Sequence, residues 1–315
     1  MRLVIYKNLI LAFIFLLVSL LIAINYRVLI PEVRIIDVNK GSSSNQISNY
    51  LKKEKLIISS KLFNFYARVF SIDNDFKAGE FLLESSESIS SLGSKISEGQ
   101  NHFRKFTILP GVSYNQIINH AIKVGLINDV DAFPSELEIG EGLFYPDTYF
   151  FHKGDSLSKL LLESQKKWKL ISDELWKMRR KELPYQSLKE AVTLASIIEK
   201  EGSEKEKIAG VFINRLKRGM KLQSDPTVIY ALGSNFDGDI KKKDLSIDNP
   251  YNTYRYKGLP PGPISTVSEE SLKAALNPLK TDFLYFVSMG NGFHKFSKTL
   301  SEHNKAVLKY QINGR

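Results

Sequence analysis

Two glutamates, Glu199 and Glu201, lie near the end of the segment LASIIEKEGS (residues 194–203). The five residues before them in this segment, 194–198, carry no charge. At about 100° per residue the two positions lie roughly 160° apart on a helix, so only one of them can face a given cleft. A carboxyl group beside apolar surface, at the negative end of a helix, has a raised pKa that suits a general acid near neutral pH. Periodicity does not choose between the two residues, and the alternative is that both simply solvate the helix end.

Other catalytic chemistries lack their residues in this chain. There is no cysteine, and the five histidines are scattered without metal-ligand spacing. No nucleophile elbow, phosphate loop or dinucleotide fingerprint occurs. The sequence therefore predicts neither a metal nor a cofactor, and the remaining candidates are carboxylates.

The amino-terminal segment from Asn8 to Asn25 is uncharged and close to the length that spans a bilayer as a helix. No small-x-small cleavage site follows it, which favours a retained anchor over a signal peptide. Arg2 and Lys7 precede the span and predict a cytoplasmic amino terminus. We therefore expect residues 1–26 to be a cytoplasmic stub and a single-pass anchor in the inner (cytoplasmic) membrane, with the remainder extracytoplasmic. The net charge of +10 then suits anionic lipid or an acidic polymer, not nucleic acid.

Residues 39–57 and 109–127 repeat each other without a gap, with nine of nineteen positions identical. Each copy follows an extended apolar segment, and the shared unit reads as a strand, a glycine turn and a helix that begins at a serine. A fainter third copy lies in residues 152–165, where any capped helix after a strand would look alike. The region 31–109 is thus a small α+β module that resembles LysM-type sugar-binding modules in pattern only.

From residue 110 to 315 we expect a mainly helical domain with a small β-sheet, which makes the fold class α+β. One helix should end at Gly202, and Ser203 to Glu206 read as a capping box for the next helix. Asp225 should cap a further helix, with Pro226 in its first turn. Residues 283–288 read as a buried strand paired with the segment FHKFS.

Five motifs appear in order over about 165 residues and together resemble the YceG-like family, the endolytic murein transglycosylases of the MltG type. They are EGLFYPDTYFF (141–151), LASIIEKE (194–201), AGVFINRLKRGMKLQSDPTVIYALG (209–233), YNTYRYKGLPPGPIS (251–265) and LYFVSMGNGFHKFSKTLSEHN (284–304). The resemblance implies a membrane-anchored enzyme that cuts peptidoglycan strands internally, between N-acetylmuramic acid and N-acetylglucosamine, and leaves a 1,6-anhydro end. It also implies association with peptidoglycan synthases and termination of nascent strands.

By this resemblance the catalytic acid is Glu201, and Glu199 is a supporting or solvated partner. The other motif residues are expected to line the sugar groove through amide, hydroxyl, carboxyl and aromatic groups. These candidates are Glu141, Asp147, Tyr149, Gln223, Asp225, Thr227, Asn252 and Tyr254. For Asp225 the capping role competes with ligand contact, and for the 141–149 cluster the alternative is a structural turn around Pro146.

Two other functions stay open at this stage. A hydrolase would need a second carboxylate, for which Glu141 and Asp147 are the candidates. A non-catalytic peptidoglycan-binding scaffold for cell-wall synthases would need none. The chemical nature of the released ends distinguishes all three.

Overall fold

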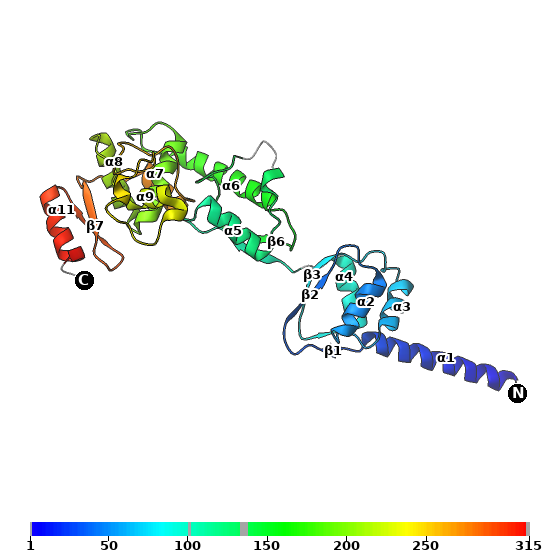
Figure 1. Ribbon diagram of the computed structural model, residues 1–315. Coiled ribbons are helices and arrows are strands. Elements are labelled where there is room, and N and C mark those ends of the chain that lie inside the picture. Colours follow the sequence, from blue (N-terminus) through cyan, green and yellow to red (C-terminus); the bar gives the residue numbers. More distant parts are fainter. Residues whose placement is uncertain (1, 100–101, 133–137, 313–315) are drawn as a thin grey trace. The chain divides into compact units, whose positions relative to one another are not determined.

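The computed structural model describes residues 2–99, 102–132 and 138–312 of the chain. It divides into two compact units (Figure 1). The first unit comprises Met1–Arg104 with Phe150–Asp155, and the second comprises Lys105–Tyr149 with Ser156–Arg315. Each unit has its own apolar core.

The first unit packs three helices against one face of a two-stranded sheet. Its elements are α1 (Arg2–Asn25), β1 (Val28–Leu29), β2 (Arg34–Val38), α2 (Ser44–Lys53), α3 (Ser60–Val69), β3 (Gly79–Leu83), β4 (Ser86–Glu87) and α4 (Ile89–Glu98). β2 and β3 are antiparallel, with Ile36 opposite Phe81, and these two side chains enter the core with Phe63 of α3. Because side chains alternate along a strand, Ile35 points away from the helices.

The predicted repeat is confirmed as a structural unit. After β2, Gly41 takes a positive φ and Ser43 begins α2; after β5 (Arg104–Thr107), Gly111 and Ser113 do the same for α5 (Tyr114–Val124). In both copies the serine and the glutamine three residues later form a reciprocal capping box. A strand, glycine and serine also precede the helix after residue 156, but that helix begins without a capping box.

The second unit is mainly helical, with a small hairpin. Its remaining elements are α6 (Leu157–Lys177), α7 (Leu188–Glu201), α8 (Lys205–Lys217), α9 (Asp225–Leu232), α10 (Glu269–Leu276), β7 (Tyr285–Ser288), β8 (His294–Ser297), α11 (Leu300–Val307), 3₁₀ turns at Val130–Ala132, Gly233–Asn235 and Asp244–Ser246, and a π-helical turn at Leu308–Ile312. β6 (Thr148–Phe151) pairs with β5, and the division between the units falls within both strands. The predicted pairing of β7 with β8 is confirmed.

Helix α7 forms the centre of the second unit and contacts α6, α8, α9 and α10 (Figure 1). Every residue from Ala191 to Ile198 is buried, so apolar side chains surround the helix until its last turn. The helix ends at Gly202, as predicted. The α+β prediction is thus confirmed, and the packing leaves the end of α7 as the place where charged side chains emerge from the core.

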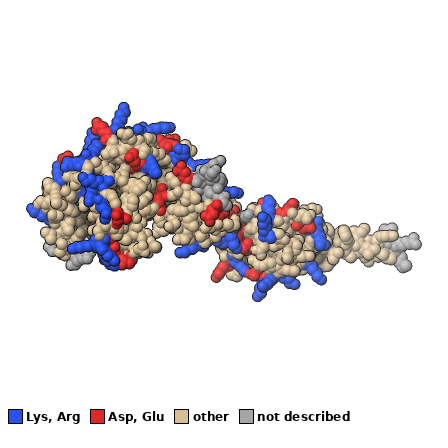
Figure 2. Space-filling model, turned by 45° about the horizontal axis from the view of Figure 1, so that its top comes forward, with Lys and Arg blue, Asp and Glu red and all other residues tan. Residues whose placement is uncertain are grey.

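Helix α1 is long and apolar enough to cross a membrane between Val4 and Asn25. Most of its side chains are exposed, unlike those of a soluble core helix. On the face drawn in Figure 2, its surface shows neither red nor blue side chains, whereas both signs of charge are interspersed over the rest of the protein.

Candidate active site

The last turn of α7 directs its two glutamates to different neighbours. Glu199 reaches the start of α10, where its Oε2 accepts hydrogen bonds from the backbone N–H of Ser268 (2.9 Å) and from the Ser268 hydroxyl (2.5 Å). Its Oε1 pairs with Nζ of Lys205 at 2.9 Å. Burial alone would raise the pKa of Glu199, but the hydrogen bonds outweigh it and the pKa is lowered. Glu199 is an ionised structural carboxylate that joins α7, α8 and α10.

The side chain of Glu201, the last residue of α7, reaches the start of α9. The buried hydroxyl of Ser224 donates to its Oε1 at 2.5 Å. Burial raises the pKa of Glu201 to about 7; the nearby Asp225 carboxyl adds to the rise, while the Ser224 hydrogen bond and the Arg215 charge oppose it. A carboxyl group that is protonated near neutral pH, yet partly accessible, has the property of a general acid.

The structure corrects the cap predicted for α9. Ser224, not Asp225, occupies the N-cap; its hydroxyl makes no side-chain cap and donates to Glu201. Asp225 lies in the first turn with an exposed side chain, and its Oδ1 accepts a 2.5 Å hydrogen bond from the hydroxyl of Tyr254. Both residues are therefore turned towards the Glu201 side of the helix terminus.

The loop before α9 is held in an unusual conformation. Gln223 is exposed and has a φ of 52°, a left-handed backbone that a non-glycine residue adopts at an energetic cost. Buried Arg215 fixes this loop from behind, since its guanidinium donates to the carbonyls of Leu222 (2.7 Å) and Lys221 (3.2 Å). Arg215 also donates to the carbonyl of Leu284, ahead of β7, at 2.6 Å. The strained turn and its buried support together place Ser224 against the acid.

Two predicted groove residues do not reach the surface. Thr227 is fully buried and donates to the carbonyl of Ser224 (2.7 Å), and it also shares a hydrogen bond with Thr253 (2.8 Å). Asn252 is fully buried and its amide donates to the carbonyls of Leu245 and Ile247. Their side chains are occupied in fixing the backbone around Ser224 and Tyr254, so the predicted contact with a sugar is not available to them.

A second carboxyl group with a raised pKa lies in the 141–149 segment. Burial raises the pKa of Glu141 to about 7, although the carboxylate accepts a hydrogen bond from the N–H of Tyr114 at 2.9 Å. Its charge also contributes to the raised pKa values of Tyr230 and Tyr251, whose rings lie 4.8 Å apart. Glu141 is therefore close to a pair of aromatic rings supplied by α9 and the 251–265 motif.

The other two predicted residues of that segment have structural partners. Asp147 pairs with Nζ of Lys167 at 2.6 Å, and this hydrogen bond lowers its pKa. Tyr149 is buried, and its hydroxyl donates to the carbonyl of Tyr145 at 2.9 Å. Both fit the alternative of a structural turn in this segment.

The turn after Glu201 also differs from its prediction. Helix α8 begins at Lys205 with Glu204 at the N-cap and without a side-chain cap, so the capping box predicted for Ser203 to Glu206 is wrong. The helix starts one residue later than this box requires, and the carboxylate of its N-cap residue Glu204 accepts the backbone N–H of His294 (2.7 Å) and pairs with Lys207 (2.9 Å). These bonds hold the turn against the β7–β8 hairpin.

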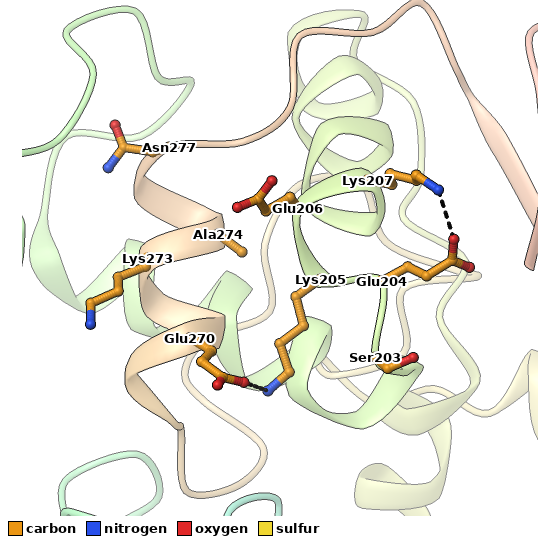
Figure 3. Close-up of a pocket in the computed structure, with 9 residues that line it drawn as sticks. All are labelled: Ser203, Glu204, Lys205, Glu206, Lys207, Glu270, Lys273, Ala274 and Asn277. Atoms are coloured by element: carbon orange, nitrogen blue, oxygen red, sulfur yellow. Dashed lines mark hydrogen bonds and ion pairs between the residues drawn. The ribbon is translucent and has the colours of Figure 1, made fainter. Parts of the chain in front are cut away.

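A pocket of about 660 Å³ opens beside this turn, between the first turn of α8 and α10. Figure 3 shows the Lys205–Glu270 and Lys207–Glu204 pairs at its rim, and Glu201 is not among its lining residues. Lys205, which lines the pocket, is also the ion-pair partner of Glu199. Among the described residues, no group of three or more histidines and carboxylates is placed to hold a metal ion.

Sequence reasoning missed Ser224, Arg215 and Ser268, which set the properties of the two glutamates. Ser224 has no signal of its own in the sequence, because serine and aspartate are equally good N-caps and Pro226 favours the aspartate directly before it. Arg215 and Ser268 have none either, since their roles depend on loops that come together only in the folded unit.

A small helical core that presents one half-buried glutamate beside a strained polar turn defines a carboxylate-based site. The sequence model of the YceG-like family matches residues 36–309, and the chain belongs to this family.

Named relatives agree with that assignment. The chain is 35% identical to the endolytic murein transglycosylase of Bacillus subtilis (strain 168), over 87% of this chain and 84% of the relative. It is 28% identical to the endolytic murein transglycosylase of Streptococcus pneumoniae serotype 2, over 87% of this chain and 58% of that longer protein. A crystal structure of a YceG-like protein from Listeria monocytogenes is similar, with a TM-score of 0.57 and 35% identity, over 87% of this chain and 98% of that one.

Proposed function

We propose that this protein is a membrane-anchored lytic transglycosylase that cuts peptidoglycan strands internally, between N-acetylmuramic acid and N-acetylglucosamine. The observation that carries the proposal is the carboxyl group of Glu201, which is held by Ser224 at the end of α7 with a pKa near 7. The relatives' names, endolytic murein transglycosylase, support the same reaction class.

The chemistry needs one carboxyl group and no added water. Glu201 donates its proton to the glycosidic oxygen as the bond from that oxygen to muramyl C1 breaks. The C6 hydroxyl of the same muramyl residue then attacks C1, and its proton passes to the Glu201 carboxylate, which restores the acid. Because the nucleophile is tethered to the reacting ring, its effective concentration is high. The products are a 1,6-anhydro end and a free N-acetylglucosamine hydroxyl.

The residues around Glu201 have distinct roles in this proposal. Ser224 orients the carboxyl group, while Asp225 supplies negative charge beside the positive charge that develops at C1. Exposed Gln223 and partly exposed Tyr254 provide amide and aromatic surface for the sugar. Glu141 with Tyr230 and Tyr251 forms a further sugar-contacting surface.

The surroundings of the two candidate second carboxylates favour this reaction over hydrolysis. Hydrolysis would require a second carboxylate to activate water or attack the sugar. The Asp147 carboxylate is bound to Lys167, and the half-buried carboxyl group of Glu141 is bound to the backbone N–H of Tyr114. Hydrolysis would give reducing ends, whereas the lytic reaction gives products lighter by one water, about 18 Da. Mass spectrometry of the fragments separates the two outcomes.

The decisive variant is Glu201→Gln, matched by Glu199→Gln in the same turn of α7. The first change removes the proton donor, so we expect release of anhydro-ended fragments to fall by at least about 100-fold. The second change leaves the donor in place, so anhydro-ended products should still form. The measurement is fragment release from purified peptidoglycan, with circular dichroism to verify folding. Wild-type release by the Glu201 variant would contradict the proposal, and inactivity of the wild-type protein beside an active control enzyme would favour a non-catalytic scaffold.

The remaining parts of the proposal concern the cellular setting. We assign α1 as a single-pass anchor with a cytoplasmic amino terminus, and the active unit to the extracytoplasmic side of the inner membrane. We assign the first unit to glycan binding, supported by the order strand, helix, helix, strand in β2, α2, α3 and β3, which LysM-type modules share. Cleavage in this location would terminate nascent strands beside peptidoglycan synthases, the partners that family resemblance implies.

A further inference from the structure

We propose that one face of α3 rests on the bilayer that holds α1, so that the first unit is seated on the membrane surface. This inference rests on the proposed anchoring of α1. The face comprises Phe65, Arg68, Val69 and Phe70 and is called the α3 face below. Phe65, Val69 and Phe70 are 49%, 59% and 59% exposed, an unusual exposure for large apolar side chains grouped on one short helix.

No linker separates α1 from the folded unit. Ile24 is buried in the core of the first unit, and Leu20 packs against the same core. The side chain of Asn25, the last residue of α1, accepts a hydrogen bond from the Ser90 hydroxyl at 2.9 Å, and β1 begins at Val28. The orientation of the unit relative to α1 is therefore fixed by packing.

The free part of α1 is too short to hold the first unit away from the membrane surface. From Val4 to Ser19 the helix is clear of the unit and rises roughly 24 Å, at about 1.5 Å per residue. The hydrocarbon core is about 30 Å thick. A helix of this length spans the core only if the turn from Leu20 to Asn25, which contacts α3 and α4, also lies at or within the hydrocarbon boundary. The surfaces around that turn then meet the head groups.

The α3 face lies at this end of the unit. Helix α3 runs antiparallel to α4. Towards its end, Tyr66 packs on Gly93 in the middle of α4. One turn earlier, Phe63 contacts the ring of Phe76, and the next residue, Lys77, donates its N–H to the carbonyl of Ile96 near the end of α4. The carboxyl-terminal end of α3 is thus beside the start of α4, which is where Ser90 meets α1. Figure 1 shows α3 beside the end of α1 in agreement with the contact between the two helices.

The composition of α3 suits an interface with lipid. Its ten residues, SKLFNFYARV, include two basic side chains and no acidic one. Aromatic and aliphatic groups interleaved with basic residues are typical of segments that lie in the head-group region, where anionic lipid attracts the charge. Tyr26, which directly follows α1 and is 58% exposed, adds an amphipathic ring at the same level.

The absence of cysteine from the chain allows a direct test with the full-length protein. Single-cysteine variants Phe65→Cys and Val69→Cys are labelled with an environment-sensitive fluorophore and reconstituted into vesicles of phosphatidylcholine and phosphatidylglycerol. Ile35→Cys is the matched control, since Ile35 is also 49% exposed but lies on the sheet face away from the helices. Phe15→Cys, in the middle of α1, verifies insertion.

The readout is quenching by spin-labelled lipid against quenching by aqueous iodide. We expect lipid-borne quenching at Phe65 and Val69 to exceed that at Ile35 by at least about twofold, with the opposite order for iodide. Equal iodide access at all three positions, with Phe15 quenched by lipid, would overturn the seating of α3 while leaving the anchor intact. Shielding from both quenchers would overturn it in favour of a protein contact. A Phe15 label that lipid does not quench would instead contradict the anchor itself.

Discussion

At the scale of single residues, Glu199 and Glu201 show that environment assigns the role of a carboxylate. The two side chains leave the same helical turn, yet hydrogen bonds from Ser268 and Lys205 lower the pKa of the first, while burial raises the pKa of the second to about 7. A pair of acids whose pKa values are pushed apart is a recurring feature of acid–base sites. Here only the one with the raised pKa can donate a proton near neutral pH.

The pH dependence of the reaction tests the neighbours of Glu201. Activity should fall as pH rises through the pKa of Glu201, because the ionised form cannot protonate the leaving oxygen. Removing the Ser224 hydroxyl in Ser224→Ala deletes a bond that favours the anion, so this alkaline limb should move to higher pH while the rate drops about tenfold from lost orientation. Asp225→Asn deletes a charge that opposes ionisation, so its limb should move to lower pH. Profiles of fragment release against pH give both limbs, and shifts in the same direction would refute these roles.

Glu199→Gln should have its main effect on stability. The change removes the charge that Lys205 faces, and Lys205 is only 16% exposed. It also weakens two hydrogen bonds to Ser268, at the start of α10. We expect the free energy of unfolding to fall by about 2 kcal/mol, the usual cost of breaking a buried charged hydrogen-bond group. Urea unfolding at pH 7 measures this, and an unchanged midpoint would show that Glu199 is not a structural carboxylate.

At the scale of elements, apolar periodicity and turn residues predicted most of what the structure shows. The helix ending at Gly202, the repeated strand–glycine–serine unit and the β7–β8 hairpin follow from local rules that act within a few residues. The failures occur at two helix starts where the residue found at the N-cap bonds a distant partner: Glu204 bonds the backbone of His294, and Ser224 bonds Glu201. These partners are 90 and 23 residues away, beyond the reach of a local rule. The prediction of Thr227 and Asn252 as groove residues fails for a related reason, since their burial depends on the folded unit.

The end of α7 depends on a glycine for two reasons. Gly202 has a φ of 157° and a ψ of −167°, a conformation that is costly for other residues, and a Cβ there would lie 2.9 Å from Cε1 of His294. Gly202→Ala should therefore push the hairpin away from the turn that presents Glu201. We expect a loss of about 2 kcal/mol in stability and at least a tenfold loss in fragment release. Gly219→Ala is a suitable comparison, since it also has a positive φ but nothing within 4 Å of the added atom. Equal effects of the two variants would show that the contact with His294 is unimportant.

At the scale of the whole molecule, the two cores are built around different helices. The core of the first unit includes the end of α1, so this unit is built onto the membrane-spanning candidate helix. The core of the second unit is centred on α7, whose last turn carries Glu199 and Glu201. The family motifs from residue 141 onward all fall in the second unit except for Phe150 and Phe151, which explains why the sequence predicted chemistry there and only a fold pattern in the first unit.

The raised pKa values of Glu201 and Glu141 make the second unit less stable at neutral pH than in mild acid. Between about pH 4.5, the ordinary value, and pH 7, the folded state holds protons that the unfolded state has lost, so stability falls as pH rises and is level above that range. After allowance for partial exposure, each group should contribute about 2 kcal/mol. The lowered pKa of His303 has the opposite effect: below its ordinary value of 6.5 it makes stability rise with pH. This effect is the same in the wild type and in a variant of Glu201, so it cancels when the two are compared.

Trp168 and Trp176 are the only tryptophans of the chain, and both belong to the second unit, so their fluorescence reports the unfolding of that unit alone. We expect the melting temperature of the wild-type protein to be several degrees lower at pH 8 than at pH 5, about 4 °C for each 2 kcal/mol in a unit of this size. Glu201→Gln should lose roughly half of this difference, because its amide carries no proton to release, and should be more stable than the wild type at pH 8. If the variant kept the full difference between the two pH values, the carboxyl group of Glu201 would have an ordinary pKa and could not be the acid.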